Sequence, residues 1–140
     1  MRILALDLGK KRIGCALSDP LGITAQPLTH VKRTSIARDL DELRRIVEAN
    51  EVTLIVMGMP YDSSGNVGIA GEYTKKFAEK IKVALNLPVE FQDERFSTVA
   101  VERVLIDGGV SRAKRKGVVD KQAAAYILQG YLDARATHHE

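Results

Sequence analysis

The amino-acid sequence predicts an α/β protein with one mixed five-stranded sheet and helices on both faces of that sheet. Three observations predict this arrangement. Residues 2–29 hold three short apolar segments separated by turn residues, which is the pattern of an antiparallel meander. After them the apolar period changes from strand to helix, and helices then alternate with short apolar strands. Strand–helix–strand units connect parallel strands, so the first, fourth and fifth strands should run parallel.

The meander can be assigned residue by residue. Residues 2–8 (RILALDL) are apolar at successive positions, which indicates a central strand covered on both faces. A turn at residues 9–11 leads into a second strand over residues 12–18. Residues 19–22 (DPLG) suit a type I turn, with Asp first, Pro second and Gly fourth. The third strand is expected over residues 23–29.

The remaining elements complete the order βββαβαβαα. Ser35 is the candidate N-cap of the first helix, and the apolar residues after it recur at helical spacing. The expected elements are, in chain order, a helix ending at residue 50, a strand over 53–57, a loop over 61–68, a helix ending near 85, a strand over 88–92, a helix over 97–106 and a final helix over 119–135.

The composition is that of one globular domain spanning residues 1–140. Hydrophobic residues make up 45% and charged residues 28% of the chain, which is unlike a disordered protein. The single cysteine, Cys15, excludes an internal disulfide and a cysteine-rich zinc site, and we expect it in the core. The sequence has no secretory signal and no membrane-length apolar run. We therefore expect a cytoplasmic protein without a membrane partner.

Asp7 is the most informative residue for function because it stands inside an apolar strand. An ionised carboxylate in a strand covered on both faces is unfavourable unless a cation or hydrogen bonds compensate its charge. One interpretation is that Asp7 binds a metal ion. The alternative is structural, with Asp7 accepting hydrogen bonds from the amides of the Gly9 turn.

Two further acids are candidates to join Asp7. Glu94 directly follows the fifth strand, and the carboxyl ends of parallel strands meet at one edge of a sheet. Asp93 is the alternative ligand, since one of these two acids can pair with Arg95 or cap the next helix. Asp120 starts the expected final helix, where an N-cap role is the alternative. Three convergent carboxylates would suit Mg²⁺ or Mn²⁺, ions that activate water for phosphodiester hydrolysis.

The net charge is only +3, but basic residues concentrate between residues 112 and 121. Such a segment either contacts phosphate or forms a solvated face. Glycines at positions 108, 109 and 117 bracket it, so we expect it to be mobile until a substrate binds. The basic residues are Arg112, Lys114, Arg115, Lys116 and Lys121.

Four sequence blocks together resemble the YqgF family of RuvC-like Holliday-junction resolvases. They occur in the family's order and span nearly the whole chain. The blocks are DLGKKRIG at 7–14 with Ser18-Asp19 after it, GMP at 58–60 with Gly65, DERFST at 93–98 and DKQAA at 120–124. The resemblance implies a ribonuclease-H-like fold with sheet order 3-2-1-4-5. It also implies a metal-dependent nuclease of ribosome biogenesis that trims the 5′ end of the 16S ribosomal RNA precursor.

The resemblance also assigns roles to individual residues. The catalytic residues that bind Mg²⁺ or Mn²⁺ would be Asp7, Glu94 and Asp120. Phosphate contacts would come from Lys11, Arg12, Arg95, Lys116 and Lys121. One departure matters, because the second acid of the wider superfamily usually ends the fourth strand. Here that strand ends in GMP, so Glu94 on the fifth strand must substitute for it.

Two rival functions remain open. An Asp-x-Gly hairpin also opens the actin-like ATPases and sugar kinases, but those proteins clamp a nucleotide between two such domains and this chain provides one. A binding module for RNA or branched DNA would keep the fold and cut weakly. Within the nuclease interpretation a DNA four-way junction is the alternative to ribosomal RNA, because phosphate contacts carry no sequence information. The oligomeric state is open between a monomer and a weak homodimer.

Overall fold

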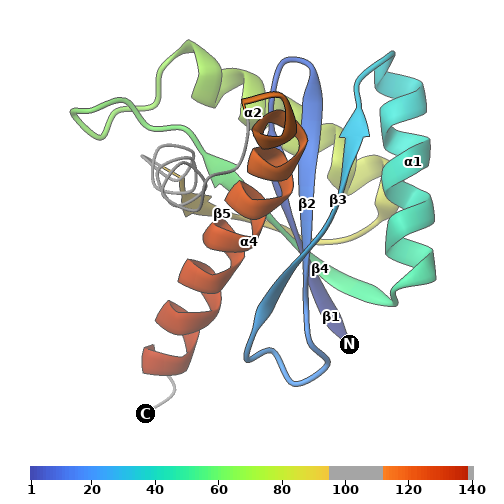
Figure 1. The fold of residues 1–140 in the computed structure, drawn as a ribbon, viewed down its shortest axis with the longest axis vertical. Helices are drawn as coiled ribbons and strands as arrows, with labels where there is room; N and C mark the ends of the chain where they lie inside the picture. The colour runs from blue at the N-terminus through green and yellow to red at the C-terminus, as the bar shows by residue number, and fades with distance from the viewer. Residues whose placement is uncertain (95–111, 139–140) are drawn as a thin grey trace.

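Five strands form one mixed sheet in the computed structural model, which describes residues 1–94 and 112–138, with side chains described for 1–94 and 120–136 (Figure 1). The strands are β1 (Arg2–Leu8), β2 (Arg12–Ser18), β3 (Ala25–Lys32), β4 (Val52–Met59) and β5 (Val89–Asp93). Their order across the sheet is β3-β2-β1-β4-β5. β2 pairs antiparallel with β1 and β3, whereas β4 pairs parallel with β1 and β5. The expected meander, parallel strands and strand order are confirmed.

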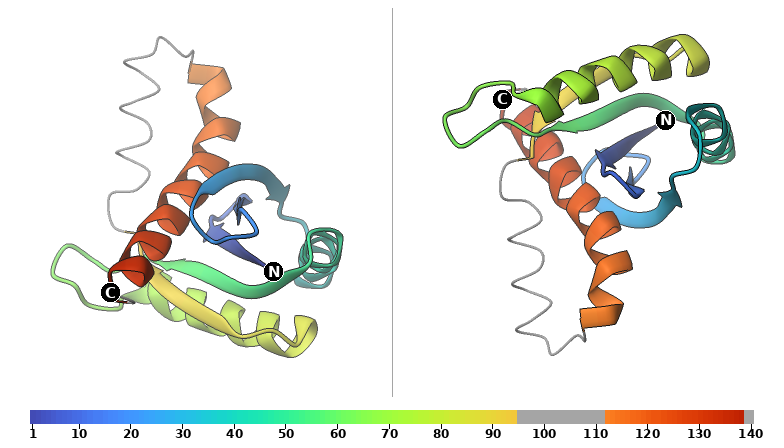
Figure 2. Two further views of the ribbon diagram at one scale, coloured as in Figure 1. Left: turned by 90° about the horizontal axis from the view of Figure 1, so that it is seen from below. Right: turned by 90° about the horizontal axis from the view of Figure 1, so that it is seen from above.

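Helices cover both faces of this sheet (Figure 2). Two helices, α1 and α2, pack on one face, and α4 packs on the other. Their bounds are Ile36–Ala49 for α1, Ile69–Leu85 for α2 and Arg112–His138 for α4. The helix expected over residues 97–106 lies outside the described residues. Within the described ranges, no helix is long and apolar enough to cross a membrane.

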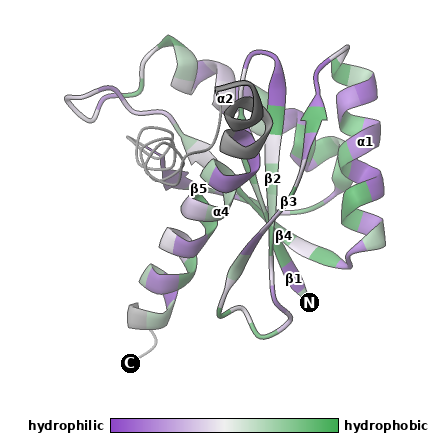
Figure 3. Cartoon of the chain, in the orientation of Figure 1, coloured by the Kyte–Doolittle hydropathy of each residue, from purple (hydrophilic) through white to green (hydrophobic). Residues whose placement is uncertain are grey.

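β1 is covered on both sides, as its sequence predicts. Leu4 and Leu6 pack in the cluster formed with α1 and α2, while Ile3 and Ala5 pack in the cluster formed with α4. Cys15 is fully buried as expected, and burial raises the pKa of its thiol to about 12. Hydrophobic and hydrophilic residues alternate along α1, as in an amphipathic helix with one buried face (Figure 3).

The third strand begins two residues later than expected, at Ala25, and continues to Lys32. The Asp19 carboxylate explains the late start, because its Oδ1 accepts hydrogen bonds from the amides of Ile23 at 2.6 Å and Thr24 at 2.7 Å. These two amides therefore belong to the turn. The Gly22 amide closes that turn on the Asp19 carbonyl oxygen at 3.0 Å, so the predicted turn is confirmed.

The helix α1 starts as predicted and buries most of the face that its apolar spacing indicates, because Leu43 and Val47 are buried and Leu40 and Ile46 pack against the same core. The Ser35 side chain caps it by accepting a hydrogen bond from the Arg38 amide at 3.2 Å. Asp39 is only 2% exposed and shares the buried face with Leu43, whereas Ile36, the first apolar residue at that spacing, is 40% exposed. A buried acid needs a partner, and for Asp39 that partner is Arg33.

The final helix begins at Arg112 instead of near residue 119. Gly117 lies inside it, at a cost of about 1 kcal/mol relative to alanine that a helix of 27 residues tolerates. The basic segment 112–121 is therefore helical, and its expected mobility stays a prediction. Asp120 lies within the helix, so both the boundary near residue 119 and the N-cap alternative for Asp120 are wrong.

Candidate active site

Asp7 and Glu94 come together at the carboxyl edge of the sheet. Asp7 is the penultimate residue of β1, and Glu94 directly follows β5, with β4 between these two strands. The Glu94 amide donates a hydrogen bond to the Met59 carbonyl oxygen at 3.2 Å. This bond extends the pairing with β4 beyond the end of β5 and positions the Glu94 backbone. The side chains meet through a hydrogen bond between their carboxyl groups, which confirms the expected meeting of these two acids.

Gly58 on β4 makes room for this contact. A Cβ atom on Gly58 would overlap Glu94 Oε2 and would lie 2.7 Å from Ile127 Cδ1 on α4. The Glu94 carboxyl group therefore lies against the backbone of β4, in space that a side chain at position 58 would fill. This packing lets the acid that follows β5 reach the edge where β4 ends in glycine and methionine.

Each of the two carboxyl groups changes the pKa of the other. Burial raises the pKa of Glu94 to about 9, and the neighbouring charge of Asp7 contributes to the rise. Burial also raises the pKa of Asp7, while the hydrogen bond from Glu94 partly offsets this rise and the charge of Asp120 adds to it. These directions make Glu94 the donor and Asp7 the acceptor of the hydrogen bond, so Glu94 keeps its proton at neutral pH.

Glu94 Oε2 is a second sign of an unusual environment. It is buried, and it has no hydrogen-bond partner in the part of the chain that the structure describes. Buried polar atoms are nearly always hydrogen-bonded in proteins, so an exception needs an explanation. A carboxylate oxygen in this position is available to a ligand.

The helix α4 brings Asp120 to the same edge through its contact with Gly14. Gly14 pairs with Asp7 across the β1–β2 hairpin, and a Cβ atom on Gly14 would overlap the Asp120 backbone. The Asp120 carboxylate forms an ion pair with Arg12, and these side chains are 22% and 31% exposed. Arg12 thus partly balances a third negative charge, which still acts on Asp7 and raises the pKa of its carboxyl group.

Asp120 therefore lies near the other two acids without completing a cluster with them. Among the side chains that are described, no three acids, histidines or cysteines form a group placed to hold one metal ion. The expected convergence is reached for Asp7 and Glu94, and Asp120 remains paired with Arg12. The three-ligand metal site stays a prediction.

The turn after Asp7 is held from outside the hairpin. Arg33 Nη1 donates a hydrogen bond to the Gly9 carbonyl oxygen at 3.0 Å, and the Arg33 amide donates to the Lys11 carbonyl oxygen at 2.9 Å. The Gly9 amide donates to the Arg12 carbonyl oxygen at 2.9 Å. That amide is thus unavailable to Asp7, which weakens the structural alternative for the Asp7 carboxylate.

A family model described as "RuvX: Holliday junction resolvase" matches residues 1–134. The chain belongs to this family. Two curated relatives carry the name "Putative pre-16S rRNA nuclease". The one from Clostridium botulinum (strain Alaska E43) is 50% identical over 133 residues, which cover 95% of this chain and 97% of the relative. The one from Desulforamulus reducens is 52% identical over 136 residues, which cover 97% and 99% of the two chains.

Solved structures confirm the fold of this RuvX chain. RuvC from T. thermophilus in complex with a Holliday junction matches with a TM-score of 0.59 and 16% identity, covering 97% of this chain and 96% of RuvC. The Fowlpox virus resolvase bound to junction DNA matches with a TM-score of 0.56 and 14% identity, covering 96% and 99%. The fold is therefore ribonuclease-H-like, as the sequence blocks imply.

The predicted phosphate-binding residues of the RuvX chain differ in their surroundings. Lys11 is exposed on the β1–β2 turn, Arg12 pairs with Asp120, and Lys121 is partly buried beside Asp120. Arg95 lies outside the described residues, as does the side chain of Lys116. Lys11 is therefore the most exposed of the described candidates, whereas Arg12 must leave its ion pair with Asp120 before it can contact phosphate.

Arg33 is a residue that sequence reasoning missed. Its Nε lies 3.4 Å from Asp39 Oδ2, and the two side chains are 12% and 3% exposed. The Thr34 amide donates to Asp39 Oδ1 at 3.1 Å, so the buried acid of α1 is compensated from both sides. The only sequence signal is an arginine shortly before a helix with an acid in its first turn, which is too common to be specific.

Arg33→Met is expected to lower the free energy of unfolding by about 3 kcal/mol, because it leaves the buried Asp39 carboxylate without its counter-charge. Urea denaturation followed by circular dichroism measures this. The matched control is Arg45→Met, which removes an exposed ion pair with Glu42 and should cost less than about 1 kcal/mol. Equal losses of unfolding free energy in the two variants would contradict the role of Arg33 as the counter-charge of Asp39.

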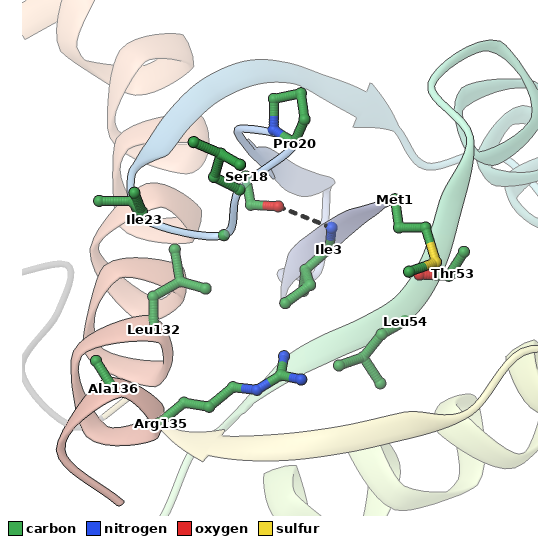
Figure 4. A pocket seen from close by; sticks show the side chains of 12 residues that line it. Met1, Ile3, Ser18, Pro20, Ile23, Thr53, Leu54, Leu132, Arg135 and Ala136 are labelled. Atoms are coloured by element: carbon green, nitrogen blue, oxygen red, sulfur yellow. Dashed lines mark hydrogen bonds between the residues drawn. The ribbon is translucent and has the colours of Figure 1, made fainter. Parts of the chain in front are cut away.

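A separate hollow of about 510 Å³ lies at the opposite end of the sheet (Figure 4). Ile3 and Ser18 line it, and the Ser18 hydroxyl accepts a hydrogen bond from the Ile3 amide at 2.9 Å. Arg135 supplies the one ionisable side chain among its described lining residues. Since acid–base or metal chemistry needs more than this, the carboxylate edge is the candidate active site.

Proposed function

We propose that the chain is a metal-dependent nuclease that hydrolyses phosphodiester bonds, with residues 1–140 forming one nuclease domain. The observation that carries this proposal is the contact between the partly buried Asp7 and Glu94 at the carboxyl edge, with the buried Glu94 Oε2 lacking a partner in the described chain. Two partly buried acids side by side oppose folding. Groups perturbed in this way concentrate at functional sites, which supports a catalytic role for the pair.

The chemistry of the donors fits Mg²⁺ or Mn²⁺, which favour carboxylate oxygens. Asp7 and Glu94 would hold the ion, and Asp120 would join them once its ion pair with Arg12 opens. When bound, the metal supplies a charge that activates water and stabilises the leaving oxygen of a phosphodiester. Arg12, released from Asp120, and Lys11 on the same turn would then contact the substrate phosphate and hold it at the carboxylate edge.

The proposed substrate is the precursor of 16S ribosomal RNA, trimmed at its 5′ end in the cytoplasm. Relatives about half identical to this chain over nearly its whole length carry that name. Branched DNA is the second candidate, favoured by the description of the family model. The junction-bound structures share only 14–16% identity with the chain and support the fold alone.

A cleavage assay tests the activity and separates the two substrates. The purified chain is incubated with precursor RNA, single-stranded DNA and a four-way DNA junction, each with Mg²⁺, Mn²⁺ or EDTA. We expect metal-dependent cleavage of the RNA and none in EDTA. Cleavage of the junction in preference to RNA would establish the second candidate, and binding without cleavage of any substrate would leave a binding module.

A thermal shift measures which carboxylates bind the metal. Mn²⁺ should raise the Tm of the wild type, since a ligand at about 100 times its Kd contributes about 2.7 kcal/mol to the folded state. Glu94→Gln and Asp120→Asn should each reduce the shift, whereas Asp93→Asn should retain it. A full shift in Asp120→Asn would show that α4 supplies no ligand, and a lost shift in Asp93→Asn would move the assignment to that neighbouring acid.

A further inference from the structure

The start of α2 presents an exposed apolar corner beside the carboxylate edge. Ile69 is 93% exposed and Tyr73, one helical turn later, is 47% exposed. Both line a hollow of about 570 Å³ together with Val67 and Lys76. Neither Ile69 nor Tyr73 belongs to the two core clusters of the described chain. Large apolar side chains gathered at one exposed place indicate an interaction site.

Arg33 connects this corner to the turn that follows Asp7. Its Nη2 donates a hydrogen bond to the Tyr73 hydroxyl at 2.7 Å, and its Nη1 donates to the Gly9 carbonyl oxygen at 3.0 Å. A single guanidinium group therefore joins the Tyr73 ring to a residue two positions after Asp7. In Figure 1 the β1–β2 turn and the start of α2 lie at the same end of the sheet.

The same contacts hold the Tyr73 ring in one place. The Arg33 guanidinium carbon lies 5.6 Å from the centre of the Tyr73 ring and 5.2 Å from the centre of the buried Phe77 ring. Arg33 is itself fixed by the buried Asp39. A half-exposed aromatic ring that is already oriented loses little conformational entropy when a flat ligand stacks on it.

The charges around this corner favour an anionic ligand. Lys10 and Lys11 are exposed on the β1–β2 turn, and Lys76 lines the hollow itself. Glu72 is the acid among the described lining residues. Its Oε1 lies 4.0 Å from Lys75 Nζ, so this ammonium group partly balances its charge. An aromatic ring bordered by ammonium groups is the arrangement with which proteins bind single-stranded nucleic acid, through base stacking and phosphate contacts.

We propose that Tyr73, Ile69 and Lys76 form a subsite for one unpaired base of a single-stranded nucleic acid, next to the phosphate at the carboxylate edge. The subsite rests on the proposed nuclease function and adds that the substrate is single-stranded where it crosses α2. The base stacks on Tyr73, Ile69 contacts it from the preceding helical turn, and Lys76 contacts the adjoining phosphate. A paired base within a duplex cannot present its face in this way.

Binding in EDTA tests the subsite without cleavage. The affinity of a short fluorescent single-stranded RNA is measured by anisotropy for the wild type and for tyrosine variants. Tyr73→Leu should weaken binding about tenfold, within the range known for loss of one base–aromatic stack. Tyr73→Phe keeps the ring but loses the hydrogen bond from Arg33, so it should weaken binding less than Tyr73→Leu. The matched control is Tyr126→Leu on α4, where the tyrosine is 55% exposed, and it should bind like the wild type.

A second pair of variants changes only exposed side chains and should therefore leave the fold intact. Ile69→Asp changes a side chain that is 93% exposed, and Val83→Asp changes one that is 84% exposed on the same helix, away from the corner. Only Ile69→Asp should weaken binding. The tyrosine variants should bind a fully paired RNA duplex with the affinity of the wild type. On the duplex, Ile69→Asp should lose only the affinity that its added negative charge accounts for.

The outcomes separate the subsite from the catalytic proposal. Wild-type affinity in both Tyr73→Leu and Ile69→Asp, or an equal loss on duplex RNA for Tyr73→Leu, would overturn the subsite even if the chain cleaves RNA. A selective loss on single-stranded RNA would establish it even if no metal-dependent cleavage is found, because the measurement is made in EDTA.

Discussion

Asp7→Asn is expected to abolish metal-dependent cleavage while leaving the fold at least as stable as the wild type. The Asp7 carboxylate is the ligand common to every arrangement of the proposed site, and the metal's contribution of several kcal/mol corresponds to a rate loss of about a thousandfold or more. Burial and the charge of Asp120 both act against the ionised form of Asp7, so an uncharged side chain of the same shape should relieve that cost.

Two measurements check this expectation together. Cleavage is assayed with Mn²⁺, and the Tm is recorded in EDTA so that metal binding does not contribute. Asp19→Asn is a suitable control, because Asp19 belongs to the turn at the other end of β2 and should leave cleavage unchanged. A fall of many degrees in the Tm of Asp7→Asn with full residual activity would show that Asp7 is structural.

The free energy of unfolding in EDTA is expected to fall as the pH rises from about 4.5 to about 9. Glu94 has a folded-state pKa of about 9 against an ordinary value of 4.5. Between these values the folded chain holds a proton that the unfolded chain releases, so raising the pH favours unfolding. The slope reaches about 1.4 kcal/mol per pH unit for one proton. The stability that the protonated Glu94 contributes to the folded state is fully present below pH 4.5 and is lost above pH 9.

Urea denaturation at a series of pH values measures this slope. Glu94→Gln should flatten it, since the amide cannot titrate, and should therefore be more stable than the wild type near pH 9. Glu48→Gln, which changes an exposed glutamate on α1, should leave the slope unchanged. A wild-type slope that persists in Glu94→Gln would mean that other groups cause the pH dependence.

The sheet and the first two acids could be predicted because local patterns determine them. The apolar period assigns β1 to the centre of the sheet, and strand–helix–strand order makes β4 and β5 parallel to it. Asp7 and Glu94 then follow at strand ends on the same edge of the sheet. Burial of both acids in contact also required Gly58, whose lack of a side chain is visible in the sequence without its consequence for Glu94.

Long-range contacts explain what could not be predicted. The ion pair between Arg12 and Asp120 joins residues 108 positions apart, and the bond between Arg33 and Tyr73 joins residues 40 positions apart. Local sequence carries no signal for either. The start of α4 was misplaced because Gly117 and a run of basic residues resemble a connecting segment, although the helix continues through them.

The position of α4 has a consequence for protein synthesis. Two of the proposed catalytic carboxylates belong to the sheet, whereas Asp120 belongs to the last helix, which reaches the sheet through Gly14 and a row of alanines. A growing chain therefore completes the sheet and both of its acids before the third acid has been translated. Until α4 packs, one apolar face of the sheet is open and the proposed metal site lacks its third carboxylate. The proposed nuclease would thus stay inactive while only the sheet has been made, because its third carboxylate belongs to a helix that is translated later.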